Sequence, residues 1–231
     1  MSKPRNSPRD AHTPDSGAPD SGTPESGIPD PDTPDPADRD GAPALPDAAA
    51  LADLTQRLDR PVVLVGLMGV GKSTVGRRLS QCLGTPFVDA DDEVVKAAQM
   101  SIPEIFDRFG EDYFRDGERR VIARLIEDNA GRPAVIATGG GAFADDETRA
   151  LILERAIAVW LDAELDTLVA RVARKNTRPL LTGKDPRKVL GELMERRNPA
   201  YAQAPIRVTS DTGPQSNGVA RIIAALGDYL A

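Results

Sequence analysis

Short runs of apolar residues alternate along this chain with longer segments in which apolar positions recur every three or four residues. The short runs predict buried strands, and the longer segments predict amphipathic helices. The expected strands cover residues 61–65, 86–89, 133–137, 156–161 and 206–208. The expected helices cover residues 48–58, 74–83, 94–98, 101–109, 111–128, 145–155, 163–174 and 218–230. This alternation predicts an α/β fold with three layers (α/β/α) around a central parallel five-stranded sheet.

The first expected strand leads into the sequence Gly-Leu-Met-Gly-Val-Gly-Lys-Ser-Thr at positions 66–74, here called the phosphate loop. It matches the pattern G-x-x-x-x-G-K-[ST] of P-loop NTPases, and it has the preceding strand and following helix that the pattern requires. Backbone N–H groups and the positive end of a helix dipole bind phosphates in such a loop. Lys72 is expected to reach the β- and γ-phosphates and Ser73 to coordinate Mg²⁺. The expected nucleotide-binding residues are Gly69, Val70, Gly71, Lys72, Ser73 and Thr74.

Three segments are expected to meet beyond the carboxyl ends of the strands, where ligands bind in parallel sheets. They are the phosphate loop, the carboxylates Asp89 and Asp91, and the glycines at 139–141. Because the only histidine, His12, lies near the N-terminus, a carboxylate is the candidate general base. Simpler roles remain open: Asp89 can be a loop carboxylate that caps a helix, and Asp91 or Asp92 can cap the helix that follows.

The first fifty residues have a composition of their own. From Pro14 they run in a five-residue repeat of the type Pro-Asp-Ser-Gly-Ala, and they contain no aromatic side chain. Such a segment buries too little apolar surface to offset its ordering entropy, so residues 1–50 are predicted to be a disordered acidic tail and residues 51–231 the folded domain. The tail has ten acidic and four basic residues and carries −6 of the net charge of −7. The folded part is therefore nearly neutral, which argues against a nucleic-acid partner.

The remaining composition narrows the class of protein. Cys82 is the only cysteine, which excludes an intrachain disulfide. No apolar run approaches the roughly 20 residues that span a bilayer, and the N-terminus lacks the apolar stretch of a signal peptide. We therefore expect a cytoplasmic protein with no membrane partner. Residues 175–187, polar and basic, fall outside the alternation and are expected to form a mobile loop that acts as a lid.

Several short motifs, taken together, resemble those of shikimate kinases. In chain order they are the phosphate loop, Phe87-Val88-Asp89-Ala90-Asp91, Phe114-Arg115, Gly139-Gly140-Gly141, Arg178-Pro179-Leu180-Leu181 and Arg197-Asn198-Pro199-Ala200-Tyr201. The resemblance extends from about residue 60 to residue 210. It implies a kinase that uses ATP and Mg²⁺ to convert shikimate to shikimate 3-phosphate in aromatic amino acid biosynthesis. The enzyme is expected to be a monomer whose partners are small molecules.

The resemblance also implies roles for individual residues. Asp89 matches a carboxylate that holds Mg²⁺ through water, and Asp91 matches one that hydrogen-bonds substrate hydroxyls. Whether Asp91 also takes the attacking proton stays open. Arg115 and Arg197 match two arginines that grip the substrate carboxylate, and residues 139–141 match the backbone beside the substrate ring.

Two further arginines are assigned by the same resemblance. Arg178, within the expected lid, matches the arginine that closes over the transferred phosphate, and Arg171 matches one that stacks on adenine. The expected catalytic residues are therefore Lys72, Asp91 and Arg178.

Two alternative functions remain open. Another small-molecule P-loop kinase, acting on gluconate or a nucleoside monophosphate, would share the phosphate loop. It would not need Arg115 and Arg197 together with the triple glycine. A regulatory domain that keeps the fold without activity would not need Lys72, Asp91 or Arg178.

Overall fold

The computed structural model describes residues 44–173, 184–210 and 215–231, and its sheet confirms the predicted architecture. Five strands form one sheet in the order β2-β3-β1-β4-β5, and each neighbouring pair is parallel. The strands are β1 (Val62–Val65), β2 (Phe87–Asp89), β3 (Val135–Ala137), β4 (Ile157–Asp162) and β5 (Ile206–Thr209). The chain moves from β1 to one side of the sheet for β2 and β3, then to the other side for β4 and β5. The end of β1 is therefore a topological switch point, where ligands bind in open α/β sheets.

Burial explains why the strands are short apolar runs without alternation. All residues of β1 and β3 are buried, because helices cover the sheet on both faces. The edge strand β5 differs: Ile206 and Val208 are buried, whereas Arg207 and Thr209 are exposed.

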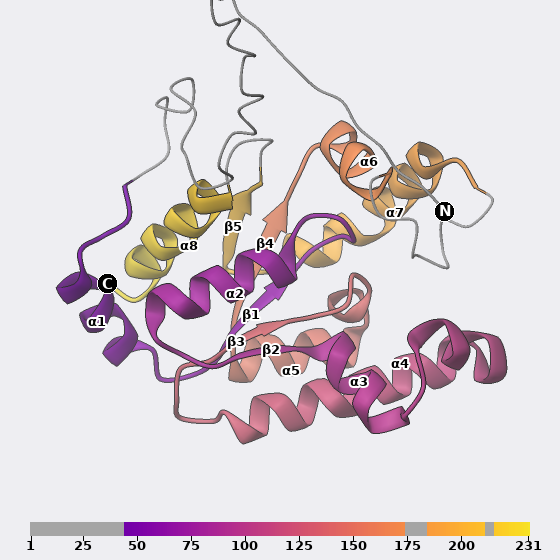
Figure 1. Ribbon diagram of the computed structural model, residues 1–231, viewed down its shortest axis with the longest axis horizontal. Coiled ribbons are helices and arrows are strands. Elements are labelled where there is room, and N and C mark those ends of the chain that lie inside the picture. The colour runs from indigo at the N-terminus through magenta and orange to yellow at the C-terminus, as the bar shows by residue number, and fades with distance from the viewer. Residues whose placement is uncertain (1–43, 174–183, 211–214) are drawn as a thin grey trace, which may run out of the picture. The chain divides into compact units, whose positions relative to one another are not determined.

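Helices form the two outer layers (Figure 1). Helix α2 packs with α1 and α8 on one face of the sheet, and α4 packs with α3 and α5 on the other. Helix α6 packs against α7. The bounds are α1 (Ala48–Arg57), α2 (Lys72–Leu83), α3 (Ala90–Ala98), α4 (Ile102–Asp128), α5 (Asp146–Arg155), α6 (Leu165–Ala173), α7 (Pro186–Tyr201) and α8 (Gln215–Tyr229), with a 3-10 turn, η2 (Ala142–Ala144). None of the helices in the described ranges is long and apolar enough to cross a membrane.

Helix α4 joins two predicted helices across a kink. Ser101 and Glu104 form a capping box at its start. Gly110 has φ 83° and ψ 175°, which no helical residue adopts. The predicted break at Gly110 is therefore confirmed, although the helical run resumes immediately after it instead of passing through a loop.

Helix α7 was not identified from the sequence. Asp185 caps it, and Pro186 occupies the first turn, where its missing N–H costs nothing. The lid predicted over 175–187 was thus extended too far, because residues 186 and 187 are helical. Residues 174–183, which include Arg178, lie outside the described part of the chain.

The predicted tail falls almost entirely outside the described residues. Residues 1–43 are not described, and residues 48–50 already belong to α1. The side chain of Asp47 caps α1 by accepting a hydrogen bond from the N–H of Ala50 at 2.8 Å.

Candidate active site

The phosphate loop connects β1 to α2, and its backbone adopts conformations that favour glycine. Gly69 and Gly71 have φ of 86° and 102°, and Gly71 is the N-cap of α2. Gly66 has φ 132°, and a Cβ placed on it would overlap the carbonyl oxygen of Leu161 in β4. Glycine is required at Gly66 both by its φ and by the close approach of the loop to the sheet.

Lys72 lies inside the phosphate loop instead of extending into solvent. Its side chain is buried, and Nζ donates hydrogen bonds to the carbonyl oxygens of Gly66 at 2.7 Å and Leu67 at 3.0 Å. The two carbonyl groups fix the position of the ammonium group but do not neutralise it. Its positive charge can therefore attract phosphoryl oxygens. Ser73 and Thr74 are exposed in the first turn of α2, where the backbone N–H groups have no helical acceptor.

Asp89, at the end of β2, is the N-cap of α3. Its Oδ1 accepts a hydrogen bond from the backbone N–H of Asp91 at 3.1 Å. The alternative that Asp91 or Asp92 caps this helix is wrong, because both lie in the first turn of α3. The capping role considered for Asp89 is confirmed.

Ser73 and Asp89 have the chemistry of a Mg²⁺ site. They supply a hydroxyl and a carboxylate, the hard oxygen donors that Mg²⁺ prefers, and the elements that carry them are in contact. The cap uses only one carboxylate oxygen of Asp89 and fixes the group, so the second oxygen can accept from a metal-bound water. The donor set therefore fits Mg²⁺ held mainly by water and phosphate.

Asp91 lies in the interior of the site. Its Oδ1 would be 2.9 Å from a Cβ placed on Gly139. Burial raises the pKa of Asp91, and the negative charge of Asp89 raises it further, while Lys72 and Arg115 offset part of the effect. The charges of Lys72 and Arg115 thus act on this carboxylate without cancelling the effect of burial, and its pKa lies above that of an ordinary aspartate.

The first and third glycines after β3 allow close approach of charged side chains. A Cβ on Gly139 would overlap Oε1 of Glu118 and press on Asp91, and one on Gly141 would lie 2.6 Å from Nη1 of Arg115. A bare Cα is needed at both positions for these groups to approach the backbone. The segments expected to converge at this edge of the sheet therefore do so.

The middle glycine links the phosphate loop to α7. A Cβ on Gly140 would be 2.9 Å from the backbone nitrogen of Met68. The carbonyl oxygen of Gly140 accepts hydrogen bonds from Nη1 of Arg197, at 2.7 Å, and from the hydroxyl of Tyr201. Burial raises the pKa of Tyr201 to about 12, so its hydroxyl remains a donor. Burial also lowers the pKa of Arg197, and the charge of Arg115 adds to this effect.

Arg115 is held by two carboxylates of its own helix. Nη1 pairs with Oε2 of Glu118 at 2.6 Å, and Nη2 pairs with Oε1 of Glu111 at 3.0 Å. Burial opposes the charge on Arg115, but the two glutamates outweigh it and raise the arginine pKa. The guanidinium is therefore fully charged and fixed in direction.

Glu118 is a site residue that the sequence analysis missed. Its side chain is 2% exposed, and burial raises its pKa although Arg115 offsets part of the effect. One signal was present: Glu118 continues the apolar stripe of α4, one turn from Phe114 and from Ile122. A glutamate on a buried helix face needs a partner, and Arg115, three residues earlier, is in position to provide one.

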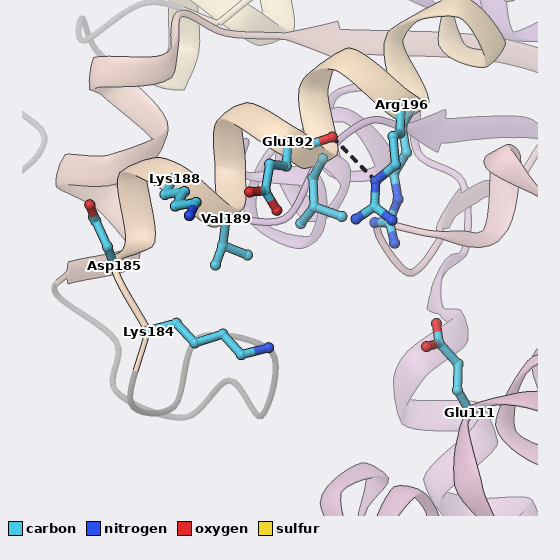
Figure 2. Close-up of a pocket in the computed structure, with 9 residues that line it drawn as sticks. Glu111, Lys184, Asp185, Lys188, Val189, Glu192 and Arg196 are labelled. Atoms are coloured by element: carbon cyan, nitrogen blue, oxygen red, sulfur yellow. Dashed lines mark hydrogen bonds between the residues drawn. The ribbon is translucent and has the colours of Figure 1, made fainter.

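An open cavity of about 510 Å³ adjoins this cluster and includes Arg197 in its wall. Figure 2 shows Glu111 of α4 across from the α7 side chains that line the cavity. The lining residues are Glu111, Lys184, Asp185, Lys188, Val189, Glu192, Leu193, Arg196 and Arg197. We call it the outer cavity.

Comparison with known proteins decides the family. The shikimate kinase family model matches residues 68–227. The chain belongs to the shikimate kinase family. A shikimate kinase of Novosphingobium aromaticivorans is 55% identical over 190 residues, 81% of this chain and 97% of that protein. One from Caulobacter vibrioides is 57% identical over 174 residues, 75% of this chain and 86% of that protein.

Solved structures of shikimate kinases agree. The enzyme of Acinetobacter baumannii in complex with shikimate has a TM-score of 0.71 at 31% identity, covering 79% of this chain and 98% of its own. A gluconokinase from Sinorhizobium meliloti 1021 has a TM-score of 0.53 at 18% identity, covering 75% of this chain and 95% of its own. That likeness concerns the fold alone.

Proposed function

We propose that this chain transfers the γ-phosphoryl group of ATP to a hydroxyl of shikimate, giving shikimate 3-phosphate for aromatic amino acid biosynthesis. The observation that carries the proposal is the glycine triplet 139–141. It brings the backbone of the phosphate loop, the carboxylate of Asp91 and the guanidinium groups of Arg115 and Arg197 together. A substrate with one carboxylate and several hydroxyls on a ring fits such a set.

The phosphate loop would hold the triphosphate. Its N–H groups and the ammonium of Lys72 would neutralise charge on the β- and γ-phosphates, and this neutralisation is most of what phosphoryl transfer requires. Ser73 and Asp89 would hold Mg²⁺, which when bound supplies further charge neutralisation and alignment of the phosphates.

Asp91 would act on the attacking hydroxyl. The hydroxyl oxygen forms a bond to the γ-phosphorus, the bond to the bridging oxygen breaks, and ADP leaves with that electron pair. Asp91 accepts the hydrogen bond of the hydroxyl, and its raised pKa makes it a suitable acceptor for the proton as well.

The substrate carboxylate would bind Arg115 and Arg197. Arginine offers two parallel N–H donors to a carboxylate. Glu118 aims the first guanidinium, and the carbonyl of Gly140 aims the second.

Arg178 completes the proposal on the strength of the resemblance alone, because it lies outside the described residues. A cation that meets the phosphoryl oxygens in the transition state should affect kcat, whereas Arg115 and Arg197 hold a group whose charge is constant and should affect KM. Arg178→Ala is therefore expected to lower kcat with little change in the KM for shikimate.

The proposal also covers the setting of the enzyme. We expect a monomer in the cytoplasm that takes small molecules and neither nucleic acid nor membrane. The near-neutral charge of residues 51–231 supports the absence of a nucleic-acid partner. Light scattering on the purified full chain measures the oligomeric state.

A coupled assay of ADP release tests the function. Shikimate, gluconate and nucleoside monophosphates are compared as acceptors with the full chain, ATP and Mg²⁺. We expect turnover with shikimate only. Turnover with gluconate or a nucleoside monophosphate would favour a different P-loop kinase, and ATP binding without any turnover would favour a regulatory domain.

A further inference from the structure

A serine at the end of β5 is tied to the phosphate loop. Ser210 directly follows β5, and its hydroxyl donates to the carbonyl oxygen of Val70 at 3.3 Å. Nη1 of Arg171, in α6, donates to the same carbonyl at 3.1 Å and to Oγ of Ser210 at 3.0 Å. The backbone N–H of Ser210 is held by the carbonyl of Asp162 at 2.6 Å, at the end of β4. The end of β5 and helix α6 therefore both bond one peptide group of the loop, and β4 holds the backbone of Ser210.

The guanidinium of Arg171, the hydroxyl of Ser210 and the carbonyl of Val70 form a closed triangle of hydrogen bonds, and there are enough donor hydrogens for all three bonds. Nη1 carries two hydrogens, one for Val70 and one for Ser210, and the serine hydroxyl uses its single hydrogen on Val70. The carbonyl oxygen has two lone pairs and accepts both bonds. Removing the hydroxyl would therefore take one donor from Val70 and one acceptor from Arg171.

Fixing this carbonyl also fixes the next N–H of the loop. In a trans peptide the carbonyl of one residue and the N–H of the following residue point in opposite directions. Holding the Val70 carbonyl toward β5 and α6 therefore turns the N–H of Gly71 away from them. Gly71 has φ 102°, and a peptide beside a glycine rotates at low cost unless something holds it.

We propose that Ser210 is a positioning residue for the nucleotide phosphates. With Arg171 it holds the peptide between Val70 and Gly71 so that the Gly71 N–H is presented to the phosphates. The proposal rests on the proposed function only in requiring that the phosphate loop binds a nucleotide. Shikimate need not be the acceptor.

Ser210→Ala removes the hydroxyl, and Ser210→Thr keeps it. Thr209→Ala is the matched control, because Thr209 is the adjacent residue and its side chain is exposed. Calorimetric titration of the full chain with Mg²⁺ and ADP, without shikimate, gives the dissociation constant. For Ser210→Ala we expect it to rise about three- to tenfold, the size of one lost hydrogen bond, with Ser210→Thr and Thr209→Ala within twofold of the wild type.

Two further measurements distinguish positioning of the phosphates by Ser210 from a general loss of structure in the variant. In the assay with shikimate, Ser210→Ala should raise the KM for ATP and leave the KM for shikimate unchanged. In direct binding, pyrophosphate, which has the phosphates without the base, should bind Ser210→Ala more weakly than it binds the wild type, by about the same factor as ADP. If the alanine variant does not fold, Ser210→Cys replaces it, since a thiol fills the space but donates weakly.

The proposal is overturned if Ser210→Ala binds ADP like the wild type, if Ser210→Thr is as weak as Ser210→Ala, or if pyrophosphate binds Ser210→Ala as well as it binds the wild type. If the wild type binds ADP but does not turn over shikimate, the proposed function is contradicted. The ADP titration of Ser210→Ala still decides whether Ser210 positions the phosphates. Normal turnover with an unaffected Ser210→Ala would contradict only the present inference.

Discussion

Nη1 of Arg115 lies 2.6 Å from Oε2 of Glu118, and the other carboxylate oxygen of Glu118 is buried without a hydrogen-bond partner among the described residues. The pair thus has one oxygen that fixes the arginine and one unused acceptor beside Gly139. A buried acceptor without a partner is costly, and a substrate hydroxyl or a water molecule can satisfy it.

The pair should therefore act as a unit on shikimate binding. Arg115→Ala would remove the proposed charge-assisted hydrogen bond to the substrate and should raise the KM for shikimate about ten- to a hundredfold. Glu118→Gln keeps the volume but removes the charge that aims Arg115, so it should raise the same KM about tenfold. Neither should change the KM for ATP. The double variant should be no worse than Arg115→Ala, and additive effects in steady-state kinetics would show that Glu118 does not act through Arg115.

Gly141→Ala tests the close approach of Arg115 to the backbone. The added methyl group would lie 2.6 Å from Nη1 of Arg115, and the guanidinium can move aside because it ends a flexible side chain. We expect the KM for shikimate to rise about tenfold or more, since one charged contact is worth about that much. Gly227→Ala, in α8 with open space around it, is the control and should raise stability by about 1 kcal/mol. Thermal unfolding and kinetics of both variants are compared, and an unchanged KM in Gly141→Ala would contradict the geometry.

Asp91→Asn should cost activity and gain stability. Between about 100- and 10,000-fold of kcat should be lost if Asp91 takes the proton, and less if it only orients the hydroxyl. In the wild type, kcat should fall with decreasing pH at a pKa above the usual range of an aspartate, because burial and Asp89 raise the pKa of Asp91.

The stability effect of Asp91→Asn depends on pH with a definite sign. The folded state binds the Asp91 proton more tightly than the unfolded state, so wild-type stability falls as the pH rises from the ordinary aspartate range through the raised pKa. Asparagine does not ionise. The Tm of Asp91→Asn should therefore exceed that of the wild type at pH 7, and the difference should disappear in acid. A lower Tm at pH 7 would contradict the raised pKa.

The outer cavity should attract anionic substrates. Among the described residues, Lys184 and Lys188 form no ion pair, and the guanidinium of Arg196 bonds only the carbonyl of Glu192 at 3.3 Å. Lys188→Gln should raise the KM for shikimate about twofold at low salt and have no effect near 1 M salt, where charges are screened within about 3 Å. Arg155→Gln is the control. Arg155 ends α5 just before β4 begins, so it lies near the amino ends of the strands, whereas the site lies beyond their carboxyl ends. If the KM for shikimate depended on salt equally in the wild type, Lys188→Gln and Arg155→Gln, the cavity would not attract the substrate.

Removal of the N-terminal segment should leave catalysis intact. The cut must spare Asp47, whose side chain caps α1. A chain that starts at residue 44 should keep kcat and both KM values within about twofold, since losses of that size correspond to less than one hydrogen bond. A tenfold loss in any of them would show that residues 1–43 contribute to the site.

Much of the fold could be read from local patterns. The strands 61–65 and 133–137 are continuous apolar runs because both faces of β1 and β3 are covered. The phosphate loop was recognisable because its glycines are required locally, by positive φ at Gly69 and Gly71. Helix α7 escaped detection because Pro199 interrupts a largely polar segment, and its position depends on packing against α6.

The sequence by itself determined the five strands, the helices other than α7, the phosphate loop and the family motifs, because each depends on neighbours within a few residues. Tertiary structure decided which charged groups meet. Spacing alone did not distinguish Arg115 from the other arginines of α4. What sets Arg115 apart in the structure is its contact with Gly141, which lies in the loop after β3 and is not adjacent to α4 in sequence. The same holds for the contact of Glu118 with Gly139 and of Ser210 with Val70: the order of the strands in the sheet brings these residues together, and no local pattern records a contact between residues so far apart in the chain.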